Sequence, residues 1–161
     1  MAGKGRSDDM RGGGRPSDRS EDPRRVGRRL ALQFLYSLDV QEGANLDQME
    51  GFLHEYSADH EVRELAGRWI RAVWGCHGKL DELIGRASEN WDLSRITLVD
   101  RSNLRLAVYQ LTECPEIPAK AAINEAVELA KEFSTAQAPA FVNGVLDAVR
   151  KGIDSNIKQK E

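Results

Sequence analysis

The chain lacks the sequence signatures of membrane and secreted proteins. Its 161 residues contain no apolar run near the ~20 residues that a membrane-spanning helix needs. The N-terminus has no apolar core of a signal peptide, so a cytoplasmic location is expected. The only two cysteines, Cys76 and Cys114, lie far apart in helix-like contexts. Buried free thiols are therefore expected, with a disulfide as the alternative.

Recognisable catalytic and metal-binding patterns are also missing. Cys76 and His77 are adjacent and would point about 100° apart on a helix. The sequence has no His-Glu-x-x-His, no paired Cys-x-x-Cys, no P-loop and no Gly-rich dinucleotide loop. Ser134 lacks the Gly-x-Ser-x-Gly context of a hydrolase nucleophile. Glu125 and Glu128 are more typical of a solvated acidic edge than of a catalytic dyad. We therefore expect no metal, no cofactor and no enzymatic activity.

The net charge of −3 conceals an uneven distribution. Residues 1–29 carry nine Lys and Arg against five Asp and Glu, a balance of +4, whereas the remainder carries fourteen against twenty-one. A basic segment on an acidic body indicates nucleic-acid binding, with a solubilising tail as the alternative. Residues 1–21 have too few apolar side chains to offset the entropy of ordering, so we predict that they are disordered.

Helical periodicity dominates the rest of the chain, and no segment alternates as a strand would. Helices are expected at about 22–42, 45–56, 59–88 and 98–113, and as a closing pair within 118–149. A polar tail at 153–161 follows. We therefore predict an all-α fold. The apolar stripes of the closing pair consist of Ile123, Ala126, Val127 and Ala130, and of Phe141, Val142, Val145, Leu146 and Val149.

The first helix should begin at Asp22 as N-cap and Pro23 in the first turn. Positive charge at a helix N-terminus is unfavourable by about 0.3–1 kcal/mol per residue, yet arginines crowd this one. Spaced i, i+4, they should form two adjacent rows that face outward and bind phosphate. The alternative is pairing with Asp22 or with acidic residues elsewhere on the body. The arginines are Arg24, Arg25, Arg28 and Arg29.

Four segments resemble the NusB family of transcription antitermination proteins. The resemblance spans roughly residues 24–152 and implies two packed three-helix bundles, with subdomains of about 22–88 and 91–152. The family usually has a better helix former at Gly27, so the first two turns should be loose. The segments are RRVGRRLALQFLYSLD at 24–39, VDRSNLRLAVYQL at 99–111, INEAVELAKEFS at 123–134 and FVNGVLD at 141–147.

The resemblance implies an RNA-binding antitermination factor. Family members bind boxA-type single-stranded RNA in nascent ribosomal RNA leaders, together with the ribosomal protein NusE, and support transcription of rRNA operons within the RNA polymerase antitermination complex. The arginine rows would hold the backbone. The family also contacts RNA near the turn after the first helix of the closing pair, which implicates Gln137 and Phe141, although Phe141 fits a core role as well.

Other assignments from the resemblance stay open. A NusE-type partner is expected on the face with Asp92, Asp100, Arg101 and Arg105, which should point outward, though ordinary solvation explains exposed charges as well. A homodimer that buries the arginine helix is an alternative. NusB-like domains also precede the catalytic domain of some ribosomal-RNA cytosine methyltransferases. Since this chain ends about ten residues after the last expected helix, an antitermination factor is favoured over a methyltransferase.

Overall fold

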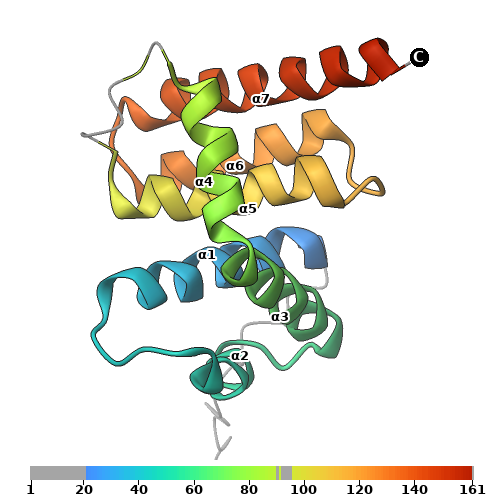
Figure 1. The fold of residues 1–161 in the computed structure, drawn as a ribbon. Helices are drawn as coiled ribbons and strands as arrows, with labels where there is room; N and C mark the ends of the chain where they lie inside the picture. Colours follow the sequence, from blue (N-terminus) through green and yellow to red (C-terminus); the bar gives the residue numbers. More distant parts are fainter. Residues whose placement is uncertain (1–20, 90, 92–95, 161) are drawn as a thin grey trace, which may run out of the picture.

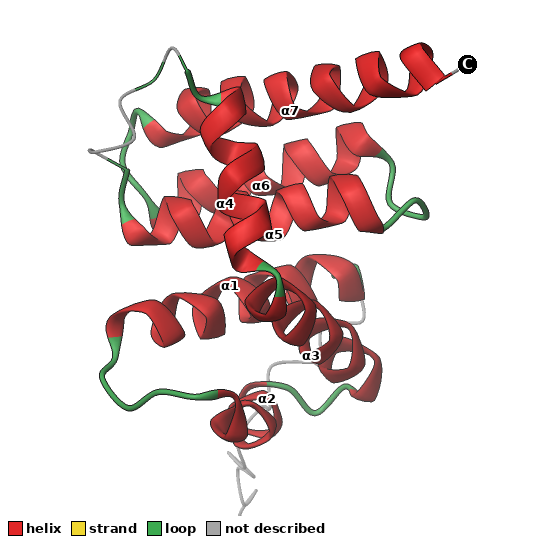
Figure 2. Cartoon of the chain, in the orientation of Figure 1, coloured by secondary structure: helices red, strands yellow, loops and turns green. Residues whose placement is uncertain are grey.

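The computed structural model describes residues 21–89, 91 and 96–160. These residues form helices and loops with no strand among them (Figure 2), so the predicted all-α fold is confirmed. The predicted disordered segment lies outside the described residues except for Glu21. In chain order the elements are α1 (Pro23–Val40), the 3₁₀ turn η1 (Leu46–Gln48), α2 (Met49–Tyr56), α3 (His60–Gly75), α4 (His77–Ala87), α5 (Leu98–Glu113), α6 (Ala119–Phe133) and α7 (Ala138–Lys160).

The helices form two groups that share one core. In Figure 1, α1, α2 and α3 lie together below α5, α6 and α7, and α4 runs from the first group to the second. α1 packs against both α3 and α5, and α4 packs against α5 and α7. These contacts place α4 with the C-terminal helices, while the subdomain limits of 22–88 and 91–152 remain a prediction.

The prediction of a single helix at 59–88 is wrong, because the helix is interrupted at Cys76. That residue ends α3 and starts α4, with φ −124° and ψ 19°. Its N–H still donates to the carbonyls of Ala72 and Val73. Gly75 and Gly78 flank the break, where their low helix propensity makes a change of direction inexpensive. The apolar stripe continues across the break, so periodicity alone does not reveal it.

Gly27 tightens the first helix against α3 instead of loosening it. A Cβ atom at this position would lie 3.2 Å from the Trp69 ring and 3.5 Å from Cβ of Leu65. A larger side chain would therefore push α1 away from α3. The helix starts as predicted, because Asp22 accepts a hydrogen bond of 2.9 Å from the Arg24 N–H and Pro23 occupies the first turn.

α5 is the central helix, and most of its middle is buried on all sides. Between Asp100 and Gln110 every residue except Arg101 and Tyr109 is buried. Buried polar side chains there need partners, and Asn103 donates to the Ala126 carbonyl at 2.8 Å. Because the middle of α5 is buried, Asp100 and Arg105, which were predicted to point outward, are buried as well.

The last helix continues well past the expected boundary. α7 runs to Lys160, through most of the segment predicted as a polar tail, and Ile153 packs against the core. Both cysteines are free thiols, as expected, with Cys114 buried and Cys76 half-buried. Across the described residues, no helix combines the length and the apolar character that crossing a membrane requires.

Candidate nucleic-acid interface

The four arginines of α1 do not form two outward rows. Arg28 turns inward, and this part of the prediction is wrong. Its guanidinium carbon lies 5.6 Å from the centroid of the Trp69 ring, and its Nε donates to Gln110 at 3.1 Å. Burial lowers the pKa of Arg28. A flat guanidinium against an indole ring is a favourable way to bury this side chain, so Arg28 packs α1 onto α3 and α5.

Arg25 and Arg29 reach the surface, but both pair with carboxylates. Arg25 donates through Nε and Nη2 to the two oxygens of Glu125, at 3.2 and 2.9 Å, and this hydrogen bond raises the pKa of Arg25. Arg29 Nε lies 3.3 Å from Glu132 and its Nη1 lies 3.6 Å from Glu21. Pairing with acidic residues elsewhere, the alternative interpretation of these arginines, is therefore the arrangement in the structure.

A shallow groove of about 360 Å³ lies between α1 and α6 at these pairs. Three cationic side chains and four carboxylates line it, so the groove carries no excess of positive charge. Glu125, predicted as part of a solvated edge, is only 18% exposed and is held by Arg25. The lining residues are Glu21, Arg25, Arg29, Glu125, Glu128, Leu129, Lys131 and Glu132.

The predicted RNA-contacting turn connects α6 to α7. Gln137 is exposed there, and its carbonyl accepts a hydrogen bond of 3.3 Å from the Phe141 N–H. Phe141 is half-buried: it packs against the core and meets the ring of Trp91 edge-to-face, with centroids 5.2 Å apart. Phe141 thus has both a core-facing and a surface-facing part. Its contact with RNA stays a prediction.

Trp91 is an exposed aromatic residue that sequence reasoning did not assign to this site. A Cβ atom on Gly144 would lie 3.1 Å from the Trp91 ring, so the missing side chain of Gly144 makes the space in which this indole rests. Trp91 remains 44% exposed. The signal available in the sequence was a glycine within an otherwise regular helix, one turn from an aromatic residue.

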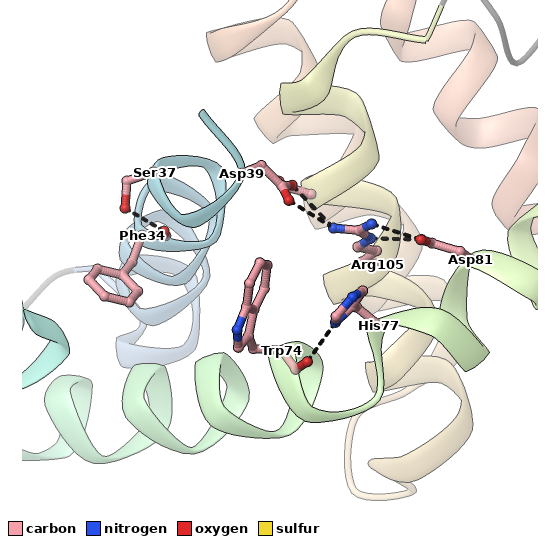
Figure 3. A network of polar contacts seen from close by, with 8 residues as sticks. Phe34, Ser37, Asp39, Trp74, His77, Asp81 and Arg105 are labelled. Carbon is pink, nitrogen blue, oxygen red and sulfur yellow. Dashed lines mark hydrogen bonds and ion pairs between the residues drawn. The ribbon is translucent and has the colours of Figure 1, made fainter. Parts of the chain in front are cut away.

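The expected outward face of α5 is wrong for Arg105. This residue is buried between α1 and α4 (Figure 3), and its guanidinium bonds both oxygens of Asp81 at 2.7 Å and Asp39 at 3.1 Å. The hydrogen bond with Asp81 raises the pKa of Arg105. Ser102 also donates to Asp39, at 3.3 Å. The group ties three helices together, which is a structural role.

Of the other three residues of the predicted partner face, one is buried, one is half-buried and one lies outside the described residues. Asp100 is buried in the first turn of α5, where its N–H donates to the Thr97 hydroxyl at 3.1 Å, so its expected exposure is also wrong. Arg101 is half-buried, and Asp92 lies outside the described residues. On α1, Tyr36 and Val40 are each 39% exposed at i, i+4 spacing. Sequence reasoning missed this apolar pair.

Comparisons with known proteins match most of the chain to one family. The family model described as NusB family matches residues 25–151. The transcription antitermination protein NusB of Syntrophus aciditrophicus (strain SB) is 37% identical over 138 residues, covering 86% of each chain. The protein of the same name from Desulfotalea psychrophila is 42% identical over 133 residues, covering 79% of this chain and 94% of its own.

Solved structures with the same fold include one that holds RNA. The structure of T. maritima NusB superposes with a TM-score of 0.71 at 36% identity, covering 81% of this chain and 92% of its own. A crystal structure of antitermination factors NusB and NusE in complex with double-stranded RNA gives a TM-score of 0.72 at 25% identity, with coverage of 81% and 97%. By family model, sequence identity and fold, this chain belongs to the NusB family.

Proposed function

We propose that this chain is an RNA-binding transcription antitermination factor that recognises boxA-type RNA in ribosomal RNA leaders together with a NusE-type protein. The observation that carries the proposal is the arginine end of α1: Arg25 and Arg29 lie at a surface groove in a chain of the NusB family. The related complex of NusB with NusE and RNA supports the same role.

The site offers two kinds of RNA contact. Arginine forks suit phosphate oxygens, and the positive end of the α1 helix dipole favours the same negative charge. The turn between α6 and α7 presents the exposed Gln137 and the half-buried Phe141, which lies beside Trp91. Aromatic faces stack on unpaired bases, whereas phosphate contacts alone carry little sequence information.

The experiment that tests this function is an RNA-binding titration by fluorescence anisotropy across a salt series. Three RNAs are compared: a single-stranded boxA-like oligonucleotide, a scrambled single strand and a duplex of the boxA-like sequence. Tighter binding to the boxA-like single strand supports the proposal. The related complex holds double-stranded RNA, so equal or tighter binding to the duplex would contradict a single-strand preference.

Phe141 provides the test of the turn. Phe141→Leu keeps most of the buried volume and removes a stacking surface worth roughly 1–3 kcal/mol per base. We expect weaker binding to the boxA-like strand and a small loss of stability, with Phe133→Leu on the neighbouring half-buried end of α6 as control. If RNA affinity is unchanged while stability falls, Phe141 belongs to the core alone.

The residues predicted to bind a NusE-type partner do not form an exposed face among the described residues. Because Asp100 and Arg105 are buried, we propose that a NusE-type protein contacts exposed residues of α1 instead, chiefly Tyr36 and Val40. Exposed apolar side chains at i, i+4 on one helix face suit such an interface. Tyr36→Ala should weaken the complex in a calorimetric titration without unfolding the chain. Unchanged affinity would place the partner elsewhere.

The protein would act within the RNA polymerase antitermination complex, in the cytoplasm and without enzymatic activity of its own. A homodimer that buries α1 would compete with RNA, because it would cover Arg25 and Arg29. Light scattering with and without the boxA-like RNA would detect this competition as a dimer that dissociates on RNA addition.

A further inference from the structure

Arg25 and Arg29 of α1 each already lie against a carboxylate in the protein without RNA. Glu125 meets Arg25 with two parallel contacts of 2.9 and 3.2 Å. Such a fork-to-fork arrangement is the one that arginine also makes with the oxygens of a phosphate. A phosphate cannot take the same two guanidinium nitrogens while the carboxylate stays in place. Arg25 must therefore release Glu125, wholly or in part, before it holds RNA in this way.

The pair on Arg29 is looser than the pair on Arg25. The Glu132 oxygen lies 3.3 Å from Arg29 Nε but makes no hydrogen bond with it, and this nitrogen is buried without a hydrogen-bond partner among the described residues. Glu132 is 46% exposed, whereas Glu125 is 18% exposed. Arg29 thus combines an unsatisfied donor with a weakly held carboxylate. It is the easier of the two arginines to transfer to a phosphate.

A third carboxylate in the groove allows the effect of pairing to be separated from the effect of charge. Glu128 lines the same groove and pairs with Lys131 at 2.9 Å. Its oxygens contact neither arginine of α1 in the described residues. Glu128→Gln and Glu132→Gln each remove one negative charge from the groove. Only Glu132→Gln also removes an ion-pair partner of an arginine on α1.

We propose that Glu125 and Glu132 of α6 act as internal substitutes for RNA phosphate, so that RNA binding is an exchange of carboxylate for phosphate on Arg25 and Arg29. The carboxylates hold the two side chains in a binding geometry and at the same time lower the affinity for RNA. This inference rests on the proposed RNA-binding function and assigns to α6 the control of affinity at that site.

The exchange makes two measurable predictions for Glu132→Gln. Exposed ion pairs contribute about 0.2–1 kcal/mol, so releasing Arg29 from Glu132, which leaves only its longer 3.6 Å pair with Glu21, should tighten RNA binding roughly 1.4- to fivefold. The salt dependence should also steepen. In the native protein the displaced carboxylate recruits a cation, which offsets part of the counterion release by RNA; in the variant it does not, so the slope of log K against log salt should change by up to about 0.7.

The experiment measures binding of the single-stranded boxA-like RNA to the full chain at several salt concentrations, for the native protein, Glu132→Gln, Glu128→Gln and Arg29→Ala. Thermal melts of all four accompany the titrations. Tighter binding and a steeper slope for Glu132→Gln, with a clearly smaller gain for Glu128→Gln, support the exchange. Equal gains from both substitutions would mean a general charge effect and overturn it, as would unchanged or weaker binding by a folded Glu132→Gln.

The same data separate this inference from the function on which it rests. If the native protein binds RNA and Arg29→Ala weakens that binding, the proposed function stands whatever Glu132→Gln does. If the native protein does not bind RNA, or if Arg29→Ala leaves binding unchanged, the function of this groove fails and the exchange fails with it. Glu125→Gln is a second variant: its amide oxygen can keep one of the two hydrogen bonds with Arg25, whereas Glu132 makes no hydrogen bond with Arg29 Nε to keep, so its gain should be smaller than that of Glu132→Gln.

Discussion

Two sets of arginine–carboxylate pairs in this molecule contain the same chemical groups and differ in their surroundings. Arg105 is enclosed by three helices, and its side chain is 7% exposed. Arg25 lies on the surface with a side chain 53% exposed. A buried pair cannot open without leaving charges out of water, whereas an exposed pair opens at little cost. Burial therefore assigns the first set to the fold and leaves the second available to a ligand.

The largest effect should come from Arg105→Met, which leaves Asp39 and Asp81 without their cation. Removing one member of a buried pair typically costs about 3–5 kcal/mol, and we expect a value near the lower end because Asp81 is 40% exposed. Urea unfolding followed by circular dichroism measures the loss. Arg101→Met, on the same helix, serves as control and should cost far less. A loss below about 1 kcal/mol for Arg105→Met would end the distinction between the two sets.

An intermediate effect is expected for Arg28→Met, because Arg28 belongs to α1 by sequence and to the core by position. The substitution removes the contact with Trp69 and the hydrogen bond to Gln110. We expect a loss of about 1–2 kcal/mol in the free energy of unfolding. The folded variant should bind RNA with the affinity of the native protein. If binding falls sharply in a variant that melts like the native protein, Arg28 contacts RNA directly.

A smaller loss is expected for Gly27→Ala, although alanine is the better helix former by about 1 kcal/mol. The new methyl group would meet the Trp69 ring at 3.2 Å, so α1 must shift slightly against α3. We expect a net change between zero and about 1 kcal/mol of destabilisation in a thermal melt. Gly51→Ala in α2, where nothing lies within 4 Å, is the control and should stabilise. Equal gains from both would show that Gly27 is not a close-contact position.

The smallest effect on folding should come from the double variant Arg25→Ala and Arg29→Ala. Each exposed pair contributes at most about 1 kcal/mol, and the loss of two like charges at i, i+4 returns part of it. RNA binding should nevertheless weaken, with the slope of log K against log salt flattened by up to about 1.4 for two phosphate contacts. A destabilisation as large as that of Arg105→Met would place these arginines with the buried set.

The periodic part of the sequence predicted the fold well. Asp22 and Pro23 gave the start of α1, and the bounds of α5 agree with the expected 98–113. Apolar residues at helical spacing carry this information because each helix must bury one face. The break at Cys76 was missed since the apolar stripe continues through it, and the extent of α7 was missed because polar residues are equally compatible with a helix on the surface.

The candidate site was harder to predict, because charges have no sequence signal for their partners. Arg25 and Glu125 are 100 positions apart, and Arg105 lies 66 positions from Asp39. Spacing on α1 places Arg25 and Arg29 in one row, but it does not reveal that Arg28 reaches an indole on another helix. The orientation of α5 was predicted wrongly for the same reason: a helix buried on all sides has no polar face to identify.

The contact between Trp91, Phe141 and Gly144 supplies an intrinsic optical probe. Trp69 is 2% exposed and Trp74 is half-buried, whereas Trp91 is 44% exposed beside the turn that carries Gln137. Indole emission shifts to longer wavelength in water, so the red edge of the protein's fluorescence should come mainly from Trp91. Ligands that reach the start of α7 should quench or shift that component and leave the blue component unchanged. Occupancy of this end of the molecule is then measurable without any attached label.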